Sequence, residues 1–289
     1  MSSDRPVGVS SDSGVVDKLL ALEKENTRLR SELDRITRER IEYLQNVSHQ
    51  LVAPLNAIKW HIENLTAGRI SVDRAKKVLR SIYSQSTIAV HLTKNFALMS
   101  NLDADHALTA LREPLQPINL HQLLVNLVDD FQPLGWDKGL KMAVDDGPLT
   151  KAPEVLAMKP LLSQAFSNII ENAVKYANRD SNITIDGYYQ KADDAVVINI
   201  INKGIPLTTN DIAKIFERGY RTVEAKNLYP AGTGFGLFIA KRIVDIHEGK
   251  INAFTNDVGR TVFQIVLSVR GLEGKTRQRA TKDDSPYRR

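Results

Sequence analysis

Three short stretches of the chain combine residue types that could carry out chemistry on phosphate groups. The first is the run Val47-Ser48-His49-Gln50-Leu51, in which His49 lies beside the apolar positions of a helical pattern. Its ring should therefore face solvent, where a neutral imidazole nitrogen is a good nucleophile near neutral pH. Taken alone, His49 could equally be an ordinary exposed histidine of a helix.

The other two stretches could contact phosphate directly. In the run 168–176, helical spacing places Asn168, Asn172 and Lys175 on one face, and a lysine can meet phosphate as a point charge. The glycines of Gly232-Thr233-Gly234-Phe235-Gly236-Leu237 allow close approach of the backbone, and a helix expected over 237–246 would point its first amides at a phosphate. Such a hexamer could also indicate a dinucleotide site, but no strand of a βαβ unit leads directly into it.

Two helical segments must present His49. From residue 15 to residue 47, apolar residues recur in steps of four and three, which is typical of the seam of a coiled coil. The register of this seam shifts by one position near Pro54, which also favours a kink. A second amphipathic helix is predicted over 72–102. Because two helices alone bury little, we expect two such hairpins from two chains to form a four-helix bundle.

The second half of the chain changes to an α+β pattern. Its predicted elements are a helix capped by Asn119 and running through Phe131, a helix over 159–177, and strands over 141–145, 183–189, 195–202 and 261–269. The two phosphate-binding stretches thus fall on a helix and on a loop that leads into another helix. The elements that follow residue 117 are enough for one domain with its own core.

Composition excludes several classes of protein. The chain has no cysteine, which rules out disulfides and thiolate metal sites. No window reaches the apolar length of a membrane helix, roughly 20 residues, and the N-terminus has no apolar region typical of a secretory signal, so a cytoplasmic protein is expected. Of the net charge of +5, residues 270–289 carry +4, from seven basic and three acidic residues. We interpret this end as a solvated tail and expect no nucleic acid partner.

Taken in order, these segments resemble the sensor histidine kinases that carry a GHKL-type ATP domain. The resemblance covers residues 42–269. Residues 47–55 are similar to the H-box, whose histidine accepts phosphate, and residues 168–176 to the N-box. Residues 201–206 resemble a variant G1 box, residues 215–221 the F-box and ATP lid, and residues 232–237 the G2 box.

The resemblance implies a set of site residues. ATP and Mg²⁺ would be the cofactors, with Asn172 as the magnesium ligand, because a hard cation prefers oxygen. His49 would be the phosphoacceptor and Gln50 would stand at the position of its base. Nucleotide binding would fall to Asn168, Asn172, Lys175, Tyr176, Asn202, Gly204, Arg221, Gly232, Gly234, Gly236, Leu237 and Thr261.

Several positions depart from the family pattern. The family usually has an acid at the position of Gln50, and an amide can orient the imidazole but cannot take its proton. Ala53 replaces the short polar residue that orients water for dephosphorylating the partner. Asn202 replaces an aspartate that reads the adenine amino group but keeps an acceptor oxygen, and Pro206 replaces a glycine.

The resemblance also implies the fold and its division into domains. We expect an α+β protein in which a coiled coil and a two-helix hairpin form a dimeric four-helix bundle, followed by an α/β-sandwich ATP-binding domain of GHKL type. The predicted parts are a disordered start (1–14), a coiled coil (15–40), a dimerisation and histidine phosphotransfer domain of HisKA type (41–104), a linker (105–117), an ATP-binding catalytic domain (118–269) and a basic disordered tail (270–289).

The function that the resemblance implies is that of an ATP-dependent protein-histidine kinase of a two-component system. It would phosphorylate His49 and pass the phosphoryl group to an aspartate of a response regulator receiver domain, with weak phosphatase activity because of Ala53. A degenerate ATP-binding dimeric scaffold is one alternative, supported by Gln50, Asn202 and Pro206. A GHKL ATPase is another, although Asn168 stands where those enzymes have a water-activating glutamate. No sensor domain is recognisable before the coiled coil, so we expect either that the chain is a fragment of a longer sensor or that a separate partner supplies the signal.

Overall fold

A computed structural model describes residues 12–66, 68, 71–102, 114–230 and 232–271. Most of the predicted disordered start, of the linker 105–117 and of the basic tail 270–289 therefore lies outside the described residues. The chain divides into two compact units, residues 1–48 and residues 49–289, and each is described by itself.

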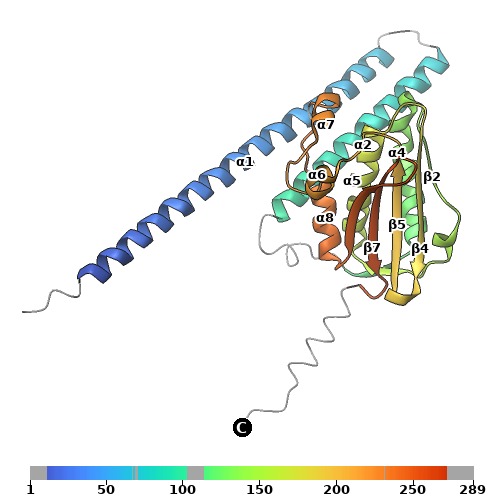
Figure 1. The fold of residues 1–289 in the computed structure, drawn as a ribbon. Helices are drawn as coiled ribbons and strands as arrows, with labels where there is room; N and C mark the ends of the chain where they lie inside the picture. Colours follow the sequence, from blue (N-terminus) through green and yellow to red (C-terminus); the bar gives the residue numbers. More distant parts are fainter. Residues whose placement is uncertain (1–11, 67, 69–70, 103–113, 231, 272–289) are drawn as a thin grey trace, which may run out of the picture. The chain divides into compact units, whose positions relative to one another are not determined.

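Two long helices form the first part of the chain (Figure 1). Helix α1 spans Asp12–Thr66, and it begins three residues before the predicted start of the coiled coil and continues through Pro54. Helix α2 spans Val72–Leu102, as predicted, and is joined to α1 by a hydrogen bond of 2.8 Å between Ser81 Oγ and His61 Nε2. Among the described residues, no helix is both long and apolar enough to cross a membrane.

Between residues 15 and 36, the apolar residues of the predicted coiled-coil seam are exposed in the single chain. They include Val15, Leu19, Leu22, Leu29, Leu33 and Ile36, which all lie in the unit that ends at residue 48. Exposed apolar stripes of this kind are typical of surfaces that bind another protein.

The second half of the chain is built on a five-stranded sheet with the order β2-β4-β5-β7-β6. Its strands are β2 (Lys141–Val144), β4 (Asn182–Gln190), β5 (Ala195–Asn202), β6 (Lys250–Thr255) and β7 (Thr261–Ser268). Strands β2 and β4 are parallel and the other pairs are antiparallel. A separate pair joins β1 (Gln116–Ile118) to β3 (Val155–Ala157).

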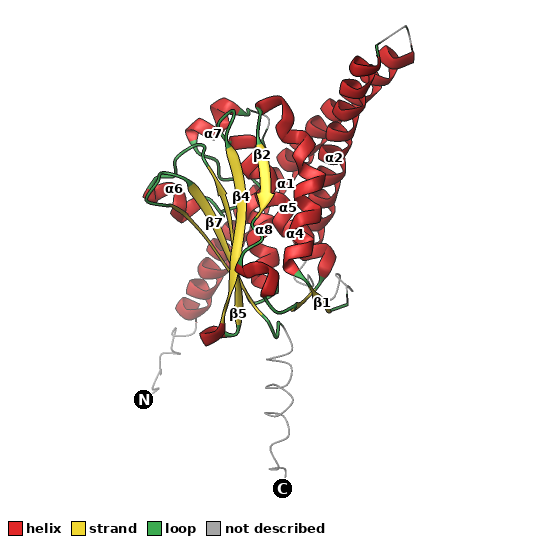
Figure 2. Cartoon of the chain, turned by 90° about the vertical axis from the view of Figure 1, so that its right-hand side faces the viewer, coloured by secondary structure: helices red, strands yellow, loops and turns green. Residues whose placement is uncertain are grey.

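Three helices cover one face of this sheet (Figure 2). They are α4 (Leu120–Gly135), α5 (Lys159–Tyr176) and α8 (Gly236–Ile246). Fully buried side chains of α5 and of the central strands form the core, among them Phe166, Ile169, Ile170, Ile185, Ile198 and Ile200. Burial of this much apolar surface is the main contribution to the stability of the domain.

Short elements complete the fold. Helices α6 (Thr209–Lys214) and α7 (Val223–Leu228) lie in the connection from β5 to α8, and 3-10 turns span Trp136–Lys138, Pro148–Lys151 and Lys191–Asp193. As predicted, Asn119 caps α4: its side-chain oxygen accepts a hydrogen bond of 2.9 Å from the backbone amide of Gln122.

Candidate active site

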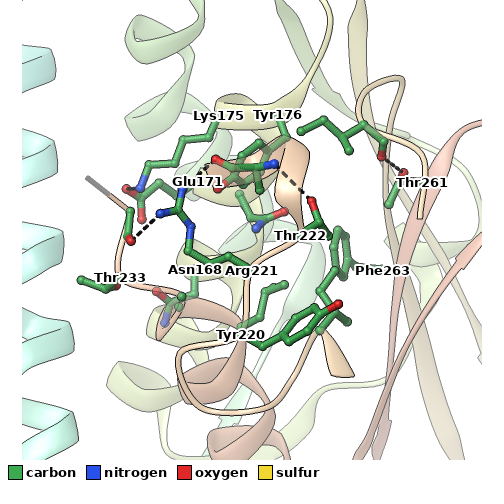
Figure 3. A pocket seen from close by; sticks show the side chains of 18 of the residues that line it. Asn168, Glu171, Lys175, Tyr176, Tyr220, Arg221, Thr222, Thr233, Thr261 and Phe263 are labelled. Atoms are coloured by element: carbon green, nitrogen blue, oxygen red, sulfur yellow. Dashed lines mark hydrogen bonds and ion pairs between the residues drawn. The ribbon is translucent and has the colours of Figure 1, made fainter. Parts of the chain in front are cut away.

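A single pocket in the unit 49–289 gathers most of the residues predicted to bind nucleotide (Figure 3). Its empty volume is about 950 Å³, a figure that includes the open mouth of the pocket. The predicted residues that line it are Gln50, Asn168, Asn172, Lys175, Tyr176, Asn202, Arg221, Gly232, Gly234, Gly236, Leu237 and Thr261. Gly204 and His49 are not among its lining residues.

Helix α5 supplies the polar wall of the pocket. Lys175 Nζ lies 2.7 Å from Glu171 Oε1, and His91 Nε2 lies 2.9 Å from Glu171 Oε2. Burial alone would raise the pKa of Glu171, but the ion pair with Lys175 and the hydrogen bond from His91 hold that pKa well below its usual range. Burial likewise opposes the charge of Lys175, and the carboxylate of Glu171 nevertheless raises its pKa. The wall therefore carries an ion pair, with the lysine ammonium facing the pocket.

Strands β5 and β7 supply the opposite end of the pocket. Their register pairs Asn202 with Thr261, whose hydroxyl donates a hydrogen bond of 3.2 Å to the carbonyl oxygen of Ile205. The side chain of Asn202 is only 3 % exposed, and its Oδ1 has no hydrogen-bond partner in the described part of the chain. A buried acceptor without a partner costs about 1–3 kcal/mol, so a ligand that donates a hydrogen bond here would be stabilised.

Gly204 supports this end of the pocket from behind. It forms an isolated antiparallel bridge with Ala177, and a Cβ atom at this position would overlap the carbonyl oxygen of Tyr176. Only glycine allows the loop after β5 to lie this close to the end of α5. Gly204 thus places Asn202 beside α5 without lining the pocket itself.

A lid segment, residues 215–230 and 232–235, borders the pocket between α6 and α8, and Arg221 holds it together. The guanidinium donates hydrogen bonds to the carbonyl oxygens of Ala225 at 2.7 Å, Gly232 at 2.7 Å and Pro230 at 3.1 Å, and also to that of Tyr229. The sequence predicted that Arg221 approaches phosphate, whereas here its guanidinium is occupied by the backbone of the lid.

Helix α8 presents its first turn to the pocket. Gly236 and Leu237, its first two residues, line the pocket, and no side chain of the described residues caps the N-terminus of this helix. Uncapped amides at a helix N-terminus favour an anion, because the helix dipole and the N–H groups act together. With the ammonium of Lys175 nearby on the same pocket, the site is suited to a phosphate chain.

Comparison with known proteins identifies the family of this domain. Residues 158–271 match the family described as histidine kinase-, DNA gyrase B- and HSP90-like ATPase. This region of the chain is similar to the ATPase domains of that family. We refer below to the domain built on the five-stranded sheet as the ATPase domain.

Named relatives extend the similarity to the long helices. The chain is 26 % identical to the sensor histidine kinase WalK of Bacillus subtilis (strain 168) over 252 residues, which are 84 % of this chain and 38 % of WalK. It is 28 % identical to the heme sensor protein HssS of Staphylococcus aureus (strain Newman) over 251 residues, which are 87 % of this chain and 52 % of HssS. The chain thus spans between about a third and a half of the length of these relatives. The family resemblance predicted from the sequence is confirmed.

A solved structure shares the fold. The full-length ShkA structure in complex with AMPPNP aligns with a TM-score of 0.52 at 20 % identity and covers 80 % of this chain and 46 % of that one. Together with the match to the ATPase family, this confirms the predicted fold class, a helical first part followed by an α/β domain.

Residues 49–55 of the predicted H-box lie on α1 in the same unit as the ATPase domain. His49 is exposed, as predicted from its place beside the apolar seam, and Gln50 is half-buried and lines the pocket. Ala53, one turn further on, is exposed.

The pocket also contains residues that sequence reasoning missed. Glu171 lies in the N-box run but was not singled out, although its spacing of four from Lys175 is that of a helical ion pair. Asn95 comes from α2 and has no local signal that connects it to the pocket. Ile205, Ile215, Tyr220, Thr233 and Phe263 lie in the motif runs but were not singled out, and the remaining missed residues are Leu92, Leu207, Thr222 and Ala225.

Proposed function

We propose that this protein is an ATP-dependent histidine kinase that phosphorylates its own His49 and passes the phosphoryl group to an aspartate of a response regulator receiver domain. One observation carries the proposal. The pocket of the ATPase domain is lined by the N-box face and by Asn202, and also by Gln50, which directly follows the exposed His49. A phosphoryl donor and a histidine acceptor would thus belong to one site.

The residues of the pocket fit Mg-ATP. The unpartnered Oδ1 of Asn202 would accept a hydrogen bond from the adenine amino group, and Asn172 would hold magnesium through its side-chain oxygen. Bound magnesium would neutralise charge on the phosphates. Lys175 and the first amides of α8 would bind the phosphate oxygens and fix the position of the γ-phosphorus.

In the transfer step, no residue of the pocket forms a covalent bond to the phosphoryl group; the pocket only positions ATP, and His49 is the nucleophile. The unprotonated ring nitrogen of His49 forms a bond to the γ-phosphorus, the bond from that phosphorus to the bridging oxygen breaks, and ADP leaves with the electron pair. The other ring nitrogen then gives up its proton. Because the amide of Gln50 cannot take a proton, water accepts it, and we expect autophosphorylation to be slow.

Labelling tests this proposal. The wild-type chain, incubated with Mg²⁺ and γ-labelled ATP, should gain label that is acid-labile and base-stable. His49→Gln should abolish the label while nucleotide still binds, and Asn172→Asp should weaken nucleotide binding and abolish the label. Undiminished label in His49→Gln would move the acceptor to another residue. Tight ATP binding without any label in the wild type would favour the alternative of a dimeric scaffold, which Gln50 and Pro206 also support.

Ala53 bears on the balance between kinase and phosphatase activity. Dephosphorylation of a regulator needs a water held in line with the aspartyl phosphate by a short polar side chain one turn after the histidine, and a methyl group cannot hold it. Loss of one such bond costs roughly a hundredfold in rate, by analogy with oxyanion donors. We therefore propose weak phosphatase activity, which Ala53→Thr should raise. The assay mixes the wild-type chain with its purified phosphorylated regulator and follows the loss of phosphate. A rate well above that of the regulator alone would contradict the proposal.

The same function calls for a homodimer. The exposed seam of residues 15–36 needs a partner to be buried, and a second copy of the chain offers a matching seam. Light scattering should show a dimer at micromolar concentration, and deletion of residues 1–40 should weaken the dimer without abolishing it. A wild-type monomer under these conditions would contradict the proposal.

A further inference from the structure

Helices α2 and α5 share a buried cluster of polar side chains. Two members come from α2 and three from α5: His91, Asn95, Gln164, Asn168 and Glu171. All but Asn95 are almost completely buried; His91 is 5 % exposed and Asn168 is 2 % exposed. A cluster of this kind is stable only if its donors and acceptors match, so its hydrogen bonds determine how each side chain is oriented.

The donors and acceptors of the cluster follow from Gln164. Its side-chain amide donates hydrogen bonds of 2.9 Å to Nδ1 of His91 and of 2.9 Å to Oδ1 of Asn95. Because Nδ1 accepts, the proton of neutral His91 lies on Nε2. That nitrogen lies 3.0 Å from Oδ1 of Asn168 and 2.9 Å from Oε2 of Glu171, and it donates toward both.

Asn168 receives a second donor from α2. Nδ2 of Asn95 donates a hydrogen bond of 2.7 Å to the same oxygen, Oδ1 of Asn168. The reversed amide would place its NH₂ group against two donors, so α2 fixes the orientation of Asn168. Nδ2 of Asn168 is then left buried, without a partner among the described residues, on a side chain that lines the nucleotide pocket.

We propose that His91 and Asn95 are positioning residues of the nucleotide site: they hold Oδ1 of Asn168 so that its NH₂ group donates to a phosphate oxygen of the bound nucleotide. Helix α2 of the phosphotransfer hairpin thereby completes the site of the ATPase domain. His91 also holds the carboxylate that pairs with Lys175. The inference rests on the proposed nucleotide site and adds that nucleotide affinity depends on the docking of α2.

Calorimetric titration of the full chain with Mg-AMPPNP, which cannot transfer its phosphate, tests this inference. His91→Leu removes the donor from Asn168 and should weaken binding about tenfold, the effect of one hydrogen bond. His91→Gln keeps an amide donor near Nε2 and should bind within about threefold of the wild type. Should His91→Leu fail to fold, Asn95→Leu removes the second donor to Asn168 and should also weaken binding.

Two further variants separate positioning from general packing. Tyr83→Phe removes a hydrogen bond of 3.3 Å from Tyr83 to Asp130, a contact of α2 with α4 that does not involve Asn168, and should leave binding unchanged. In an Asn168→Ala background, His91→Leu should weaken binding much less than it does in the otherwise wild-type chain, because His91 acts mainly through Asn168.

The outcomes are distinct. Wild-type affinity in His91→Leu, tighter binding in that variant, or additive effects of His91→Leu and Asn168→Ala would each overturn the positioning role. A weakening of the same size in Tyr83→Phe would also overturn it, because any loosening of α2 would then suffice. A wild-type chain that binds no Mg-AMPPNP would instead overturn the proposed function itself.

Discussion

Lys175→Met should destabilise the ATPase domain far more than Glu171→Gln, although both variants break the same ion pair. The side chain of Glu171 is only 10 % exposed, whereas that of Lys175 is 38 % exposed. Without Lys175, a buried carboxylate keeps only His91 as a partner among the described residues. Without the carboxylate, the ammonium of Lys175 can turn to water. Breaking a buried pair from one side costs about 3–5 kcal/mol, and we expect about 2–3 kcal/mol here because the pair borders the pocket.

The size of this loss depends on pH. In the wild type, burial alone would raise the pKa of Glu171 above its ordinary value of 4.5, but Lys175 and His91 hold it well below that value. A lowered folded-state pKa means that the contribution of Glu171 to stability is complete above about pH 4.5 and is lost as the pH falls toward the folded pKa. In Lys175→Met, burial dominates and raises the pKa of Glu171. The destabilisation should therefore be greatest near pH 8 and shrink toward pH 5, as the carboxylate gains a proton.

Thermal unfolding of the full chain between pH 8 and pH 5 measures both effects. A loss of 2–3 kcal/mol lowers the midpoint by about 5–10 °C for a domain of this size. Glu171→Gln should lower it by less than about 3 °C, and the double variant Glu171→Gln/Lys175→Met should recover most of the loss. Equal shifts in the two single variants, or a shift in Lys175→Met that does not change with pH, would refute the reasoning.

Three further perturbations test other parts of the site and core. Gly234 has a φ of 72°, and a Cβ atom there would lie 2.7 Å from the carbonyl carbon of Gly219, so Gly234→Ala should displace the lid and weaken Mg-AMPPNP binding more than about tenfold by calorimetry. Asn202→Leu should weaken ATP binding by roughly tenfold, whereas Asn202→Asp, which keeps the acceptor, should not. Burial lowers the pKa of His247, so folding stability should fall as the pH drops below 6.5, and His247→Gln should reduce the fall in melting temperature between pH 7.5 and pH 5.5.

Long elements with a clear period could be predicted from the sequence. Helix α2 and strand β5 have the predicted bounds, because their apolar residues recur over many positions. Strands β1 and β3 were missed, since each has three residues and exists only through its pairing with the other. Strand β6 was also missed, although its burial alternates at Ile251 and Ala253, which is the usual signal of a half-buried strand.

The same distinction applies to the site: some of its residues could be predicted from local spacing, and others depend on contacts between residues far apart in the sequence. Residues such as Asn172 and Lys175 could be predicted because their spacing follows one face of a single helix. The contact of His91 with Asn168 joins residues 77 positions apart, and neither the period of α2 nor that of α5 contains it. Only the packing of the two helices brings these side chains together.

The glycines between residues 232 and 236 show how one sequence pattern can serve two purposes. They were interpreted as room for phosphate, yet a Cβ atom on Gly232 would lie 2.8 Å from Cζ of Arg221. Gly232 is therefore also needed to let the guanidinium reach the carbonyls that follow α7. For Arg221 to contact phosphate as well, its guanidinium would have to leave these carbonyls, which would then lose their donor. Arg221 therefore contributes to the site first by holding the lid in place, and the spacing of glycines reflects contacts within the protein as much as the approach of a ligand.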